Sequence, residues 1–185
     1  NLVAHGNLSI QRLTGLNGIT LGVTGGNLTS ASQMGENLLG GDIALTVSGD
    51  VGSFSDRVQL GTSGIGQQIT LDIGGDAYLG GLQGAASAPG VLTVGSATVG
   101  GLLDIGQTRD LQQTADWNLG SLVLNLANQW NMTSGTSLAT RNGIFARVSN
   151  GATLGNLSAT ASGANIDIQA HQLQANAAGR TWTAA

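Results

Sequence analysis

The sequence contains no cysteine and no lysine, and its single proline is Pro89. Without cysteine, the chain has neither disulfide bonds nor thiol chemistry. Without lysine, it lacks the residue that completes a phosphate-binding loop, so its glycine pairs do not indicate nucleotide binding. Charged residues make up 9% of the chain and the net charge is −4. Because there is no basic stretch either, we expect no nucleic-acid partner.

Long hydrophobic runs and aromatic residues are also scarce. The chain has no run of about 18 apolar residues and no signal-peptide pattern at its start. Aromatic residues account for only 3% of the sequence, but a hydrophobic share of 41% and the small net charge argue against disorder. Both ends interrupt patterned sequence, so we expect residues 1–185 to be a single internal segment of a longer repeat protein.

Short segments in which apolar and polar residues alternate recur along the whole chain. In the segment 69–73, Ile69, Leu71 and Ile73 alternate with Thr70 and Asp72, which is the period of a strand with one buried face. The other segments of this kind lie at 19–23, 43–47, 91–94, 122–126, 144–148 and 166–170. Their first residues are 22 to 31 positions apart, and a period of this size indicates a repeat architecture.

Pairs of glycines and Asn-Gly dipeptides lie between these segments and indicate tight corners. A multi-strand unit of nearly constant length favours parallel stacking of equivalent strands over an antiparallel sandwich. We therefore predict an all-β chain that forms a right-handed parallel β-helix, a solenoid of about seven coils of 22–31 residues, with its handedness taken from the crossover rule. Residues 103–120, which lie within the longest spacing, are predicted to form an irregular loop.

Two of the acidic residues occupy equivalent positions in neighbouring repeats. Asp50 and Asp76 both follow a glycine near a corner, and we expect them on adjacent coils. They make either corner contacts such as Asx turns, the more common role, or a catalytic or calcium-binding pair. A polysaccharide-cleaving enzyme would gather its acids on one outer surface, and the spacing gives no such cluster. His5 and His171 lack metal-ligand spacing, so we predict no enzyme, cofactor or metal site.

Candidate ligand-binding residues are an aromatic ring and a few arginines. Trp117 lies in the predicted loop, where an exposed ring would stack on a sugar. Arg109, in the same loop, and Arg141 and Arg147 are further candidates. Arg141, Arg147 and Arg180 form either a small basic patch or, in the interpretation we favour, separate arginines that face outward.

Four asparagines begin Asn-x-Ser/Thr sequons and are candidates for glycosylation. The favoured alternative places them in corners, where the amide would hydrogen-bond to the next coil. The four residues are Asn7, Asn27, Asn131 and Asn156.

The glycine-rich, cysteine-free coils resemble the filamentous haemagglutinin family, the large exoproteins of two-partner secretion systems. The resemblance rests on Gly-Asn-Leu at 26–28, on Gly-Asn-Leu-Ser at 6–9 and 155–158, and on the alternating Ile-Thr-Leu strands. It implies a long β-helical shaft that a partner transporter exports across the outer membrane. It also implies a virulence role at the bacterial cell surface or in secreted form, in which the full-length adhesin attaches bacteria to a host-cell receptor or surface glycan. The family's Arg-Gly-Asp tripeptide and secretion-domain start are absent.

The expected function is therefore an internal shaft segment of a filamentous adhesin. The stem of a contact-dependent growth inhibition effector is the alternative within this class, and a polysaccharide-cleaving β-helix enzyme is the alternative from another class. Because a truncated solenoid exposes unpaired strand edges and an apolar cross-section, we also expect end-to-end self-association.

Overall fold

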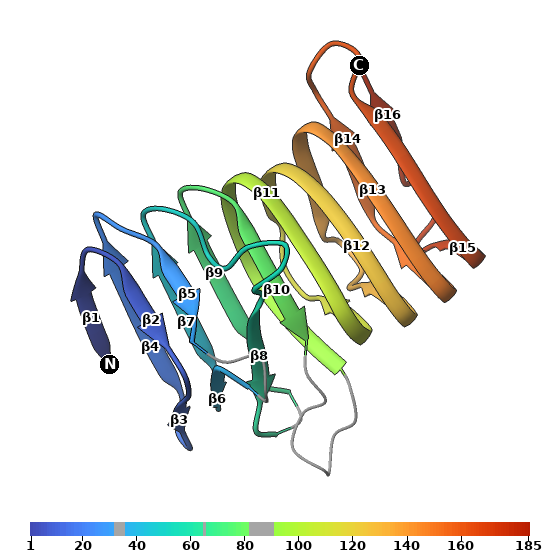
Figure 1. Cartoon of the computed structure of the whole chain (residues 1–185). Coiled ribbons are helices and arrows are strands. Elements are labelled where there is room, and N and C mark those ends of the chain that lie inside the picture. Colours follow the sequence, from blue (N-terminus) through green and yellow to red (C-terminus); the bar gives the residue numbers. More distant parts are fainter. Residues whose placement is uncertain (32–35, 65, 82–90) are drawn as a thin grey trace.

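The protein is a stack of parallel strands that follow one another along a single axis (Figure 1). The computed structural model describes residues 1–31, 36–64, 66–81 and 91–185, and these residues form no helix. The strands are β1 (Leu2–His5), β2 (Leu8–Ile10), β3 (Leu13–Gly15), β4 (Ile19–Thr24), β5 (Leu28–Ser30), β6 (Leu38–Gly40), β7 (Ile43–Val47), β8 (Val58–Thr62), β9 (Ile69–Ile73), β10 (Ala77–Gly81), β11 (Val91–Gln113), β12 (Trp117–Met132), β13 (Ser137–Leu154), β14 (Asn156–Ala159), β15 (Asn165–Ala175) and β16 (Trp182–Ala184).

Every pairing between these strands is parallel, and equivalent strands stack in three columns. Column A contains β1, β4, β7, β9, the first parts of β11, β12 and β13, and then β14 and β16. Column B contains β2, β5, the bridge residue Val51, the start of β10, the middle of β11 to β13, and the first part of β15. Column C contains β3, β6, β8, the end of β10, and the last parts of β11, β12, β13 and β15. The chain is a parallel β-solenoid of about eight turns, which confirms the predicted fold class.

Alternating side chains fill the interior of the solenoid. In β9, Ile69, Leu71 and Ile73 are buried, while Thr70 and Asp72 point outward. Leu71 lies directly above Leu45 in the strand register, and one apolar core continues in this way through the stack. Each such side chain contributes roughly 1.5–3 kcal/mol of burial free energy. The predicted alternation is confirmed, and it decides which side chains remain on the surface for function.

The predicted loop at 103–120 is wrong. Residues 103–113 continue β11, β12 begins at Trp117, and only residues 114–116 lie between the two strands. The long spacing that suggested a loop joins two columns, because the segment 69–73 lies in column A whereas 122–126 lies in column B. Measured within column A, successive turns are 19 to 26 residues long.

A ladder of side-chain oxygens joins successive turns at the corner between columns A and B. The Oδ1 atom of Asn7 accepts the backbone N–H of Asn27 at 2.9 Å, and Asn27 Oδ1 accepts that of Asp50 at 2.8 Å. Asp50 Oδ1 accepts the N–H of Asp76 at 2.8 Å, and Asp76 Oδ1 accepts that of Leu102 at 2.7 Å. The expectation that Asp50 and Asp76 lie on adjacent coils is confirmed. Each carboxylate accepts a hydrogen bond from the backbone of the next turn, whereas in an Asx turn it would accept one from a residue close to it in sequence.

The ladder also explains why a glycine comes directly before Asp50, Asp76 and Leu102. A Cβ atom at Gly75 would overlap Asp50 Oδ1, and one at Gly101 would overlap Asp76 Oδ1. The corner can therefore hold the side-chain oxygen only where the next turn has no side chain.

We expect Gly75→Ala to lower the free energy of unfolding by about 1–3 kcal/mol, because the added methyl group displaces the Asp50 carboxylate from its hydrogen bond. Urea unfolding would measure the loss. Gly22→Ala is the matched control, because its Cβ would meet no atom closer than Val3 Cγ2 at 3.8 Å. Equal unfolding midpoints for the two variants would contradict this account of the corner.

Candidate functional site

Trp117 is not available for ligands. It begins β12 in column A, its side chain is 1% exposed, and its indole Nε1–H donates a hydrogen bond to the backbone oxygen of Gly95 at 2.7 Å. The prediction of an exposed Trp117 was wrong for the same reason as the predicted loop. Trp117 begins a regular strand, and its ring packs in the core of the solenoid. Trp182 is 40% exposed, but its Nε1–H donates to the backbone oxygen of Gly155 at 2.9 Å.

The candidate arginines lie in different environments. Arg109 is exposed and its Nε lies 3.5 Å from Asp110 Oδ2. Arg141 is exposed near the corner between columns A and B, and Arg147 lies on the outer surface of column B. Arg180 donates from Nε to Asn176 Oδ1 at 2.9 Å. This distribution favours separate outward-facing arginines over a shared basic patch.

The four sequon asparagines are used mainly in contacts between turns. Asn7 and Asn27 belong to the corner ladder, and Asn156 Oδ1 accepts the backbone N–H of Thr181 at 3.2 Å. The ladder interpretation is confirmed for these three residues. Asn131 differs, because its Nδ2 donates to Gln129 Oε1 within the same strand at 3.3 Å. Glycosylation at the four sites stays a prediction.

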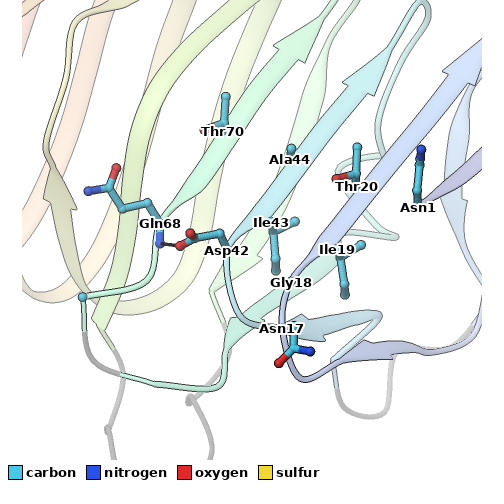
Figure 2. Close-up of a pocket in the computed structure, with 11 residues that line it drawn as sticks. Asn1, Asn17, Gly18, Ile19, Thr20, Asp42, Ile43, Ala44, Gln68 and Thr70 are labelled. Carbon is cyan, nitrogen blue, oxygen red and sulfur yellow. Dashed lines mark hydrogen bonds between the residues drawn. The ribbon is translucent and has the colours of Figure 1, made fainter.

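A polar groove with a volume of about 610 Å³ lies on column A near its corner with column C (Figure 2). Its wall on β4, β7 and β9 is formed by Thr20, Ala44 and Thr70, which stack in register. Asp42 provides the carboxylate of the groove, and its Oδ1 accepts the backbone N–H of Gln68 at 2.8 Å. A single carboxylate that also joins two turns does not make the pair of acids used in glycoside hydrolysis. The groove offers hydroxyl and amide groups for hydrogen bonding.

A second surface lies on column B and is centred on β13. Phe145 and Arg147 point outward because Ile144, Ala146 and Val148 between and beside them are buried. The Arg147 guanidinium lies 5.2 Å from the centroid of the Phe145 ring, which is the geometry of a cation–π contact.

Shallow grooves lie on both sides of this pair. One, of about 360 Å³, is lined by Phe145 and Asn142 of β13 and by Asn165 and Asp167 of the next turn. The other, of about 330 Å³, is lined by Arg147 with Ser149, Val148, Gln169 and Ala170.

The sequence predicted Arg147 as a candidate but missed Phe145. The signal for Phe145 was present, because the alternation in 144–148 places positions 145 and 147 on the same outer surface. The lining residues of the adjacent turns could not be found in the same way. They depend on the register that places Val123, Phe145 and Asp167 in one row.

The most enclosed charged pair in the described residues joins Arg57 and Asp104. Their side chains are 11% and 8% exposed, and Arg57 Nη2 lies 2.9 Å from Asp104 Oδ2. Arg57 Nη1 also donates to the backbone oxygens of Leu79 and Asp104, at 3.2 and 3.0 Å. The guanidinium thus bonds to two later turns and fastens the end of the segment 52–57, which joins column B to column C, to both of them. We assign this pair a structural role.

We expect Arg57→Met to lower the free energy of unfolding by about 3 kcal/mol, because it leaves the Asp104 carboxylate enclosed without its partner. Replacing both residues, as Arg57→Met with Asp104→Leu, should restore part of the loss, because no unpaired charge then remains. Chemical denaturation measures both effects, with Arg12→Met at an exposed arginine as the control. If Arg57→Met and Arg12→Met unfold at the same denaturant concentration, the pair has no such role.

Neither a metal site nor a spanning helix is found in the described part of the chain. No three histidine, aspartate or glutamate side chains there are grouped to hold a metal ion, and no helix there has the length and apolar character needed to cross a bilayer. Comparisons with protein-family models, with curated proteins and with solved structures found no match. Function is therefore inferred from the solenoid and the chemistry of its surface.

Proposed function

We propose that the chain forms part of the shaft of a secreted or cell-surface filamentous adhesin, which attaches bacteria to a host-cell receptor or surface glycan. The uninterrupted stack of column A carries this proposal. Nine strand segments follow one another there, and at about 4.8 Å per step they extend about 38 Å. Because each turn contacts only its neighbours, such a structure gains length simply by adding turns.

The outer surface of column A supports the same role. The row that runs along its middle consists of small or polar residues in every turn except the first, where Val3 stands. The others are Gly22, Thr46, Asp72, Thr98, Asn118, Ala139, Ser158 and Thr183. A surface of this kind keeps a long rod solvated without a strong charge.

The absence of cysteine suits the proposed export route. A chain without disulfide bonds can pass unfolded through an outer-membrane transporter and then fold outside the cell. The polysaccharide-cleaving alternative has less support, because one carboxylate oxygen of Asp50 and one of Asp76 accept backbone hydrogen bonds of the corner ladder.

Adhesion can be tested with beads that carry the purified 185-residue chain. We expect these beads to attach to cultured epithelial cells, and the soluble chain to compete with them. Beads that carry Leu71→Asp are the control, because a charge at this fully enclosed position unfolds the stack. Attachment no greater than the control would contradict adhesion. Release of oligosaccharides from the cell-surface glycans in the same samples would favour an enzyme.

We also propose that the 185-residue chain associates end to end. Among the strands that the structure describes, β1 pairs only with β4 and β15 only with β13, so each leaves one strand edge without a partner there. Leu2 and Leu173 lie at inward positions of these strands and are 41% and 43% exposed. Light scattering should therefore show a mass that rises with protein concentration. Leu2→Lys with Leu173→Lys should remain a monomer, because charges on an open edge block pairing. A wild-type chain that is monomeric at millimolar concentration would contradict the proposal.

A further inference from the structure

The stacked pair Phe145 and Arg147 separates two grooves on column B. The ring lines the groove of about 360 Å³, and the guanidinium lines the groove of about 330 Å³. Both volumes fall at the lower end of the range typical of ligand-binding sites, about 300–1,000 Å³. The two grooves share no lining residue, but they lie on either side of one cation–π pair and so provide two neighbouring subsites.

The groove beside Phe145 combines an apolar wall with polar groups. Gly143 lines this groove and lies in register between Ser121 and Asn165. Phe145 is 36% exposed, and the amide of Asn165 and the carboxylate of Asp167 line the same groove. An aromatic ring beside carboxylate and amide groups matches a pyranose, which has an apolar face and a rim of hydroxyl groups.

Arg147 differs from the arginines that serve the fold. The guanidinium groups of Arg57, Arg109 and Arg180 each contact an acidic or amide side chain. Within the described residues, the contact found for the Arg147 guanidinium is the Phe145 ring. A guanidinium held by a ring keeps its planar set of N–H donors, and that set matches a carboxylate.

A second exposed phenylalanine provides a contrast. Phe54 is 76% exposed and lies 5.6 Å from the Arg57 guanidinium. Arg57, however, is bonded to Asp104, and neither Phe54 nor Arg57 lines any of the three grooves described above. An exposed ring near an arginine is therefore not sufficient. The surface at Phe145 is distinguished by its two grooves and by a guanidinium whose contact, within the described residues, is the Phe145 ring.

We propose that the Phe145–Arg147 surface binds an acidic saccharide. A neutral pyranose stacks on Phe145, and its hydroxyl groups donate hydrogen bonds to the Asp167 carboxylate. The carboxylate of the adjoining uronic acid pairs with Arg147. Asp167 lies on the Phe145 side and repels a second negative charge there, which fixes the order of the two sugars. This proposal deepens the proposed adhesive function, on which it rests for its biological role, by naming the class of ligand.

Calorimetry on the purified chain tests the proposal, with a hyaluronan hexasaccharide as the probe because it alternates uronic acid with a neutral sugar. Chitohexaose, which has the same length without carboxylates, is the comparison ligand. We expect the hyaluronan probe to bind more tightly than chitohexaose. Phe145→Ala should weaken binding of the hyaluronan probe about 10-fold or more, as expected for an aromatic anchor. Arg147→Gln should remove the preference for the acidic probe and leave binding of chitohexaose unchanged.

The matched controls are Phe54→Ala and Arg12→Gln, which alter an exposed ring and an exposed arginine elsewhere and should bind like the wild type. Phe145→Tyr keeps the ring and should keep binding, so the result does not depend on the folding of Phe145→Ala alone. No binding of the hyaluronan probe, or binding that Phe145→Ala and Arg147→Gln leave unchanged, would overturn the proposal. Cell attachment without saccharide binding would reject this site and leave the adhesive function standing.

Discussion

The parallel backbone hydrogen bonds between successive turns impose one constraint on the whole molecule: every turn must repeat nearly the same cross-section. Strands in neighbouring turns are fixed about 4.8 Å apart, so a side chain that points inward meets the equivalent side chain of the next turn. Leu21, Leu45 and Leu71 stack in this way. The same constraint leaves little space at the corners. This explains why a glycine there lies next to the side-chain oxygen of an asparagine or aspartate in the preceding turn.

The alternation of apolar and polar residues predicted the strands, because it depends on each strand alone, and the nearly constant repeat length then predicted the solenoid. The alternation was not sufficient to assign the strands to columns. Segments of column A, such as 69–73, and of column B, such as 122–126, have the same two-residue period. Shifts of register in β11, between Val99 and Leu102 and between Ile105 and Thr108, also break strict alternation. This ambiguity produced the predicted loop and, with it, an exposed position for Trp117.

Contacts between distant residues explain what else the sequence did not disclose. Arg57 meets Asp104 across 47 positions of sequence, and no local pattern marks the two as partners. The surface at Phe145 depends similarly on three turns, because Val123, Phe145 and Asp167 become neighbours only through the register. What a strand presents outward can be predicted from its own residues, whereas a binding surface on a solenoid is assembled across strands. The acidic residues illustrate the same point, since Asp50 and Asp76 were correctly placed on adjacent coils but their bonding partners were not identified.

The corner ladder has a direction. Asn7, Asn27, Asp50 and Asp76 each provide the accepting oxygen, and the donating N–H always belongs to the turn that follows. Asp42, Asp116 and Asn156 obey the same order at other corners. A turn that has already formed therefore presents its acceptors to the turn that is still to be added. For a chain that becomes free to fold from its N-terminus first, this geometry lets each completed turn act as the template for the next.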